Sequence, residues 1–295
     1  GFWGSLPQAS AGGGLMLASI ALGLVSMLPE ASLFSWGWRI PFLASIVLLG
    51  VGWYIRVKVP ESPDFEKVKD QAQEIKVPAL QVFKNHPREL ITIIFARAAE
   101  NAWFYIASTF ALAYTTTKLG IPRQDILFAT ICGGGLIMIM TPLFGHLSDK
   151  VGQRNMFMFG LVVLLFYCYP FFSMLDTKDP LLVWTAIVLG IGVVFPLMYA
   201  PQSQLFARQF PTEIRYSGIS ISVQFAGVIG GGLAPLIATK LLSVGEGSPH
   251  LIINYIMGMA IFAIFCTFFM KGDQFNRHPS KVTLKNAAET DLSSP

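Results

Sequence analysis

Charged residues are scarce in this sequence. Asp, Glu, Lys and Arg supply 13% of its 295 residues, whereas hydrophobic residues supply 53%. Soluble globular domains carry about 25% charged residues, and a soluble surface on a chain of this length needs far more charge than is present. The shortage excludes an ordinary soluble domain and predicts an all-α protein that crosses a membrane several times.

Motifs that hold metals, phosphates or cofactors are also missing. The sequence has no H-E-x-x-H, no paired C-x-x-C and no G-x-x-x-x-G-K-[ST]. Cys132, Cys168 and Cys266 lie far apart inside apolar runs, where they fit small buried hydrophobic residues better than disulfides or ligands. We expect no metal, no cofactor and no enzymatic activity, although a membrane enzyme or receptor with helix-borne polar residues stays an alternative.

Eight apolar stretches are long enough to cross a bilayer as helices. They cover residues 4–28, 38–55, 90–116, 126–145, 155–175, 181–207, 216–242 and 251–270. The chain begins at Gly1, without a methionine or a charged leader, and enters the first stretch almost at once. We therefore expect it to be a piece of a longer membrane protein.

The basic residues form no single dense patch, which argues against a nucleic-acid partner. If the polar segment 56–88 is cytoplasmic, fifteen of the 21 Lys and Arg residues fall on that side of the membrane and five on the other. Arg97 is the remaining one and lies inside a span. Cytoplasmic loops are enriched in Lys and Arg, so the central linker and the C-terminus are predicted to be cytoplasmic.

Arg97 and Glu100 are the only charges well inside any predicted span. Residues three apart share one helix face, and Asn101 lies near that face. Intramembrane ionisable residues mark substrate pathways and proton relays. Two buried charges are an expensive way to pack helices, so a functional pair is favoured, with a structural ion pair as the alternative.

Four further polar side chains in the spans are candidate substrate contacts, namely Gln8, Tyr199, Gln202 and Gln224. Pro196 and Pro201 weaken the sixth span beside two of them and free backbone carbonyls, which a protein-lined cavity tolerates. Each polar group could instead be satisfied by helix packing.

The polar stretch 145–155 reads as a very short cytoplasmic hairpin between two spans. Its candidate gating residues are Gly145, Asp149, Lys150, Gly152 and Arg154. Glycine enters positive-φ conformations without steric cost, and an aspartate can cap exposed helix amides. Any tight cytoplasmic turn could use the same residue types, so a plain turn stays an alternative.

Three motifs resemble those of the major facilitator superfamily of transporters. They are P-E-S-P at 60–63, G-H-L-S-D-K-V-G-Q-R-N at 145–155 and F-P-T-E-I-R-Y-S-G at 210–218. W-G-W-R-I-P-F at 36–42 and A-E-N-A-W-F-Y at 99–105 look most like its metabolite:proton symporter family, whose members transport shikimate, α-ketoglutarate or proline and betaine.

This resemblance implies a helical bundle with four parts. Residues 1–55 would be the last two helices of the N-terminal half, 56–88 a cytoplasmic linker, 89–271 the complete C-terminal six-helix half and 272–295 a cytoplasmic tail. The chain would thus cover helices five to twelve of a bundle of twelve.

The resemblance also implies a monomeric secondary transporter in a bacterial inner membrane. It would carry a small polar metabolite, an organic acid or a zwitterion, by alternating access with proton symport. Glu100 would carry the proton and Arg97 would attract the substrate or tune Glu100. Asp149 would close a gate through the start of the seventh span, near Glu213 and Arg215. An uncoupled facilitator or a sugar porter is the alternative.

Overall fold

The structure, a computed structural model, describes residues 1–58, 78–212 and 214–272. The P-E-S-P motif, Glu213, most of the predicted linker and all but the first residue of the predicted tail lie outside these ranges. In the described ranges every regular element is helical, and eight helices are long and apolar enough to cross a membrane. The predicted all-α class and the number of spans are confirmed.

Four spans are single α-helices and four are composite. The single helices are α1 (Phe2–Val25), α9 (Arg123–Val151), α10 (Gln153–Asp176) and α16 (His250–Phe268). The second span joins η1 (Gly37–Arg39), α3 (Ile40–Ala44) and α4 (Ile46–Lys58), and the third joins α7 (Pro87–Tyr105), η2 (Ile106–Phe110), α8 (Ala111–Ala113) and η3 (Tyr114–Lys118). The sixth joins α11 (Pro180–Leu189), η4 (Gly190–Val194), α12 (Phe195–Tyr199) and α13 (Gln202–Ala207), and the seventh joins α14 (Arg215–Ala226), η5 (Gly227–Gly232) and α15 (Leu233–Val244). The short helices α2 (Glu30–Ser35) and α6 (Pro78–Asn85) lie between spans.

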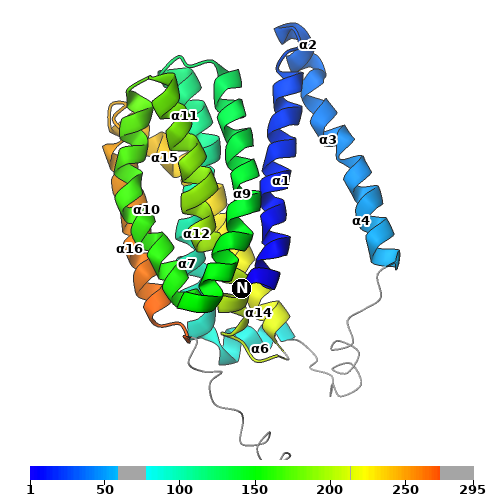
Figure 1. Ribbon diagram of the computed structural model, residues 1–295, viewed down its shortest axis with the longest axis vertical. Helices are drawn as coiled ribbons and strands as arrows, with labels where there is room; N and C mark the ends of the chain where they lie inside the picture. Colours follow the sequence, from blue (N-terminus) through cyan, green and yellow to red (C-terminus); the bar gives the residue numbers. More distant parts are fainter. Residues whose placement is uncertain (59–77, 213, 273–295) are drawn as a thin grey trace, which may run out of the picture.

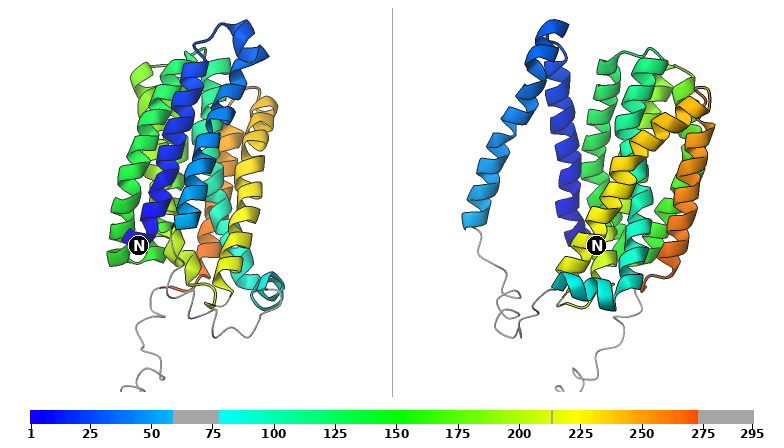
Figure 2. Two further views of the ribbon diagram at one scale, coloured as in Figure 1. Left: turned by 90° about the vertical axis from the view of Figure 1, so that its right-hand side faces the viewer. Right: turned by 180° about the vertical axis from the view of Figure 1, so that it is seen from behind.

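The six spans from α7 to α16 form one bundle, and α1 packs along its side against α9 (Figure 1). Figure 2 shows the same arrangement from two further sides, with α4 standing apart from the bundle. No residue of α4 is buried.

The contact between α1 and α9 depends on glycine. A Cβ atom on Gly12 would lie 2.3 Å from the carbonyl oxygen of Gly134. A Cβ on Gly145 would lie 2.3 Å from Ser5 Oγ. Small residues let membrane helices approach this closely, so Gly12 and Gly145 serve the packing of α1 on α9.

The hairpin between α9 and α10 is shorter than predicted. Both helices continue into the polar stretch 145–155, so that only Gly152 separates them. Gly152 has a φ of 94°, as its position in a tight turn predicts, and its N–H donates to Ser148 O over 2.9 Å. The polar residues around it keep helical backbone hydrogen bonds, so low hydropathy did not mark a helix end here.

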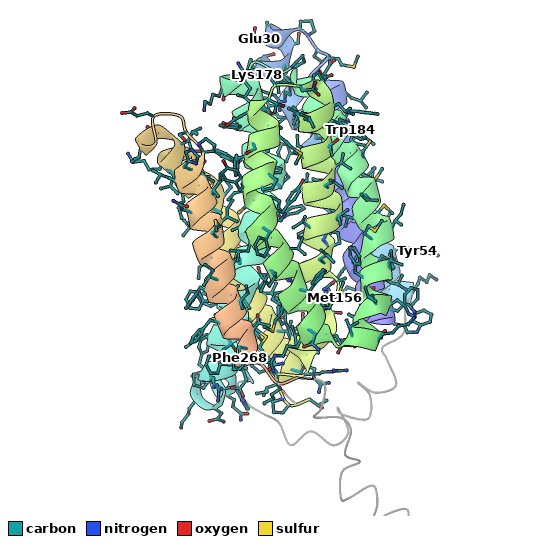
Figure 3. The ribbon with its side chains drawn as sticks, turned by 60° about the vertical axis from the view of Figure 1, so that its left-hand side comes forward. Glu30, Tyr54, Met156, Lys178, Trp184 and Phe268 are labelled. Carbon is teal, nitrogen blue, oxygen red and sulfur yellow. The ribbon has the colours of Figure 1, made fainter. Side chains whose placement is uncertain are left out.

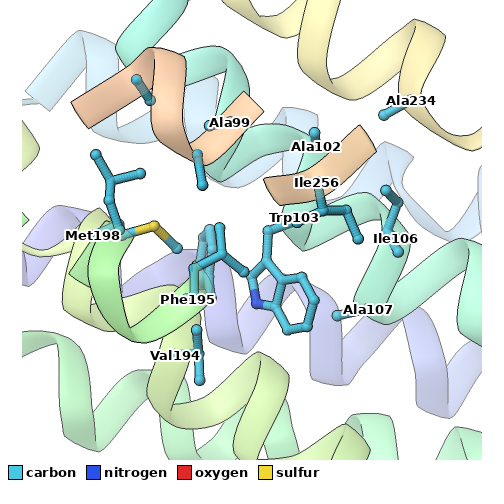
Figure 4. Close-up of a cluster of buried hydrophobic side chains, with 14 of the residues drawn as sticks. Ala99, Ala102, Trp103, Ile106, Ala107, Val194, Phe195, Met198, Ala234 and Ile256 are labelled. Atoms are coloured by element: carbon cyan, nitrogen blue, oxygen red, sulfur yellow. The ribbon is translucent and has the colours of Figure 1, made fainter. Parts of the chain in front are cut away.

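The core between the third and sixth spans is built around Trp103 (Figure 4). Its side chain is fully buried, and its indole Nε1 donates to the carbonyl oxygen of Gly190 over 2.9 Å. Gly190 begins η4, one of four π-helical turns in the described spans. π turns disturb the regular helical ladder and are frequent near functional sites. The indole thus fixes the third span against an irregular turn of the sixth.

Candidate functional site

Arg97 and Glu100 of α7 meet Gln202 at the start of α13. The Gln202 amide oxygen accepts a hydrogen bond from Arg97 Nη1, and its Nε2 donates to Glu100 Oε2 over 3.0 Å. Arg97 Nη1 lies 4.0 Å from the same carboxylate oxygen. One amide therefore bridges the two charges and joins the third span to the sixth.

The network is buried but incompletely hydrogen-bonded. The Glu100 side chain is 1% exposed and that of Arg97 is 14% exposed. Glu100 Oε1 and Arg97 Nε have no hydrogen-bond partner in the described part of the chain. Buried polar atoms without a partner are rare in folded proteins and need an explanation. Arg97 thus keeps an unused donor and Glu100 an unused acceptor within the described part of the chain.

Aromatic rings line one side of this network. The ring centroid of Tyr199 lies 5.9 Å from Arg97 Cζ, which is within the range of a cation–π contact. Phe195 stacks on Tyr199 with centroids 4.7 Å apart, and Phe104 lies 4.6 Å beyond it. The turn at Ala200 between α12 and α13 brings Tyr199 and Gln202 to the same side. The network thus combines one cation, one anion and aromatic faces.

The other predicted contacts do not join this network. Gln8 on α1 is half-buried, and its Oε1 lacks a hydrogen-bond partner. Asn101 is half-buried and, among the residues that the structure describes, makes no side-chain hydrogen bond. Gln224 is exposed on α14. Their roles as substrate contacts stay predictions.

We expected Asp149 to contact the start of the seventh span. The structure places it against the start of α1 instead. Its carboxylate accepts a hydrogen bond from the backbone N–H of Phe2 over 3.0 Å. Arg215 instead donates to Thr212 Oγ1 over 3.3 Å. Helix N-termini carry unpaired amides and a partial positive charge, which explains why an aspartate settles there.

The remaining gating residues have separate places. Arg154 Nη2 donates to the carbonyl oxygen of Phe268 over 2.7 Å and so ties α10 to α16. Gly145 allows the close approach of Ser5 on α1. Lys150 is exposed. Glu213 lies outside the described ranges, so its expected position is not tested.

A network of amides extends the Asp149 contact and was not singled out from sequence. Gln153 Nε2 donates to Asp149 Oδ1 over 3.2 Å and to Gln204 Oε1 over 2.9 Å. Arg208 Nη1 donates to Gln153 Oε1 over 2.8 Å. Gln153 belongs to the motif at 145–155, but its position in the motif does not predict a contact with Gln204, 51 residues away. Gln153 is 3% exposed, and only the structure reveals that its amide joins α9 to α13.

Metal ligands are not assembled in this region. In the ranges that the structure describes, no group of three or more His, Cys, Asp or Glu side chains could hold a metal ion.

Comparisons with known proteins place the chain in a family. The family model described as Major Facilitator Superfamily matches residues 5–235 and 99–287. The chain is 31% identical over 276 residues to the shikimate transporter of Escherichia coli (strain K12), covering 92% of this chain and 63% of that protein. It is 32% identical over 272 residues to the inner membrane metabolite transport protein YhjE of the same organism, covering 90% and 62%.

A more distant relative is the proline/betaine transporter of Escherichia coli (strain K12), 26% identical over 286 residues, covering 92% of this chain and 56% of that protein. The chain thus spans less than two thirds of the length of these curated relatives. The extent of the family match and the identity to two relatives agree with the loop motifs at 145–155 and 210–218. The chain belongs to the Major Facilitator Superfamily.

Proposed function

We propose that the whole protein is a secondary transporter that carries a small polar metabolite across a membrane by alternating access. The buried Arg97–Gln202–Glu100 network is the observation that supports this best. It lies between two spans of the bundle and holds a free donor and a free acceptor. The names of the relatives, which include shikimate and proline/betaine transporters, support an organic acid or a zwitterion as the solute.

Proton symport is the coupling mode that this geometry favours. An ionised carboxylate deep in a membrane protein is costly unless it is paired. While Glu100 is ionised, it holds Arg97 and the Gln202 amide. Protonation of Glu100 removes that charge and leaves the guanidinium free to bind a carboxylate of the solute. Protonation of Glu100 and binding of the solute's carboxylate to Arg97 would thus be positively cooperative.

Two halves rocking about the central site would supply alternating access. In this proposal residues 1–55 belong to the N-terminal half, 56–88 form a cytoplasmic linker, 89–271 form the C-terminal half and 272–295 a cytoplasmic tail. The contacts between α1 and α9 then lie between the halves. Asp149 of α9, which binds the start of α1, then closes the cytoplasmic end of the transport path. The fifteen-to-five division of basic residues supports the orientation, and the protein acts as a monomer.

Uptake by the full-length protein in proteoliposomes tests the proposal. Organic acids, betaines and sugars are offered with and without an inward proton gradient. Accumulation that collapses with the gradient supports symport, and uptake that ignores the gradient supports an uncoupled facilitator or sugar porter. Binding or turnover without any uptake would assign the chain to a receptor or an enzyme and overturn the proposal.

A further inference from the structure

A groove lies at the end of the bundle away from α6, where three candidate spans end or begin. The third span ends at Lys118, the fifth ends at Asp176, and the eighth begins at His250. Figure 3 shows this end of the bundle, with Lys178 labelled there and Phe268 at the opposite end. The groove has a volume of about 520 Å³, which is within the range of sites for small organic ligands.

The groove has a polar mouth with a defined hydrogen-bond network. Lys118 Nζ donates to the carbonyl oxygen of Gly247 and lies 3.3 Å from the Tyr114 hydroxyl oxygen. The Tyr114 hydroxyl donates in turn to Asp176 Oδ1. An ammonium group has three donors, so Lys118 keeps one for a ligand.

The mouth carries an excess of negative charge. Asp176 and Glu246 both line it, and in the described part of the chain neither has an ion-pair partner. Asp176 accepts only from a neutral hydroxyl. Lys118 is the only Lys or Arg side chain among the lining residues. Two carboxylates beside one ammonium favour a ligand that brings a positively charged group of its own.

The groove also has an apolar wall that runs along the spans. Tyr169 lies seven residues before Asp176 on α10, which is about 10 Å deeper at 1.5 Å per residue. Its side chain is 58% exposed. Phe172 and Ile253 line the groove between the two levels. Span ends lie at the headgroup level of a bilayer, so the groove matches an amphiphile with its polar end at the mouth.

We propose that this groove binds one amine-bearing phospholipid. Its ammonium group contacts Asp176 and Glu246, its phosphate accepts from the free donor of Lys118, and an acyl chain packs on the exposed ring of Tyr169. The bound lipid ties the third, fifth and eighth spans together at this end. The groove is separate from the Arg97–Glu100 network, so the inference stands apart from the proposed transport function.

Native mass spectrometry of the full-length protein tests this site. The protein is offered phosphatidylethanolamine, phosphatidylcholine and phosphatidylglycerol with matched acyl chains. We expect one phosphatidylethanolamine to be retained in preference to the other two, because only its primary ammonium donates hydrogen bonds to carboxylates. Equal retention of all three lipids, or a preference for phosphatidylglycerol, would overturn the proposal.

Isosteric variants locate the lipid. Asp176→Asn with Glu246→Gln keeps shape and the acceptor for Tyr114 but removes both charges, and should weaken phosphatidylethanolamine binding roughly tenfold or more. Glu30→Gln removes an exposed charge at the same end and outside the groove, and should leave binding unchanged. Gel filtration and thermal unfolding establish that each variant is folded, and unchanged binding by the folded double variant would contradict the proposal.

A water-soluble zwitterion that carries the same ammonium and phosphate groups as the lipid headgroup is the alternative ligand. Phosphoethanolamine lacks acyl chains, and at a concentration comparable to that of the phospholipid it should fail to displace the bound lipid, because the apolar wall contributes to binding. Displacement at comparable concentrations would identify a solute site and overturn the lipid assignment.

Discussion

Gln202 Nε2 lies 3.0 Å from Glu100 Oε2, although the two residues are 102 positions apart in the chain. Because the same amide also accepts from Arg97, Gln202 hydrogen-bonds both charges. The pair is therefore held by a neighbouring span and not by its own helix alone.

Removal of this amide should destabilise the folded protein. Gln202→Leu leaves Arg97 and Glu100 buried with fewer hydrogen bonds, which costs about 1–3 kcal/mol for each buried group left without a partner. Gln224→Leu changes the same residue type at an exposed site on α14 and should change stability by less than about 0.5 kcal/mol. Thermal unfolding in detergent compares the two, and equal midpoints would show that the bridge contributes nothing.

Packing of α1 on α9 should be sensitive to single methyl groups. Gly12→Ala places a Cβ atom 2.3 Å from Gly134 O and should destabilise this contact by about 1–3 kcal/mol. Gly14→Ala is the matched control on the same helix, because its Cβ would meet nothing within 4 Å. It should be neutral or slightly stabilising, since alanine favours helix over glycine. A stable Gly12→Ala protein would mean that the two helices are not packed this closely.

The Asp149 contact should hold the cytoplasmic end of α1. Asp149→Asn removes the charge that interacts with the helix N-terminus, and this interaction is worth about 0.3–1 kcal/mol at an exposed site in low salt. Uptake should fall and a cysteine at the cytoplasmic end of α1 should react faster with a thiol reagent. Arg215→Gln is the control, because within the described residues the Arg215 side chain hydrogen-bonds Thr212 and not Asp149. If Asp149→Asn leaves both readouts unchanged, the hairpin is only a tight turn.

Topology offers an independent test of the orientation. Single cysteines at Lys150 and Lys178 lie at opposite ends of the bundle, on either side of α10. In right-side-out vesicles, an impermeant thiol reagent should label Lys178→Cys from outside, and Lys150→Cys only after the vesicles are opened. Labelling of both from the same side would contradict the proposed arrangement.

Local features of this protein could be predicted from sequence, whereas long-range partners could not. Apolar length predicts the eight spans, and helical spacing alone puts Arg97 and Glu100 on one face. The positive φ of Gly152 follows from its place in a tight turn.

The bridge by Gln202 depends on how α13 packs beside α7, which no local pattern encodes. The same holds for Asp149, whose carboxylate accepts from a backbone amide of α1 and not of the seventh span. Similarly, the polar stretch 145–155 carries low hydropathy yet keeps helical hydrogen bonds, so hydropathy misplaced the ends of α9 and α10.

Comparison of the double variant with a single variant distinguishes a structural ion pair from a pair that couples transport to protons. Arg97→Ala with Glu100→Gln leaves no buried charge, so it should fold better than Arg97→Ala alone, in which an ionised Glu100 lacks its partner. The double variant should not regain uptake driven by a proton gradient. Accumulation of solute by this variant would exclude both residues from coupling.

The most direct test of the account is transport by Glu100→Gln in proteoliposomes of the full-length protein. Glutamine keeps the size and the hydrogen bonding of Glu100 but cannot bind and release a proton. Counterflow exchange of the solute should persist, while accumulation driven by an inward proton gradient should be abolished. If the folded variant still accumulates the solute against its concentration gradient, Glu100 does not carry the coupling proton and the central claim is wrong.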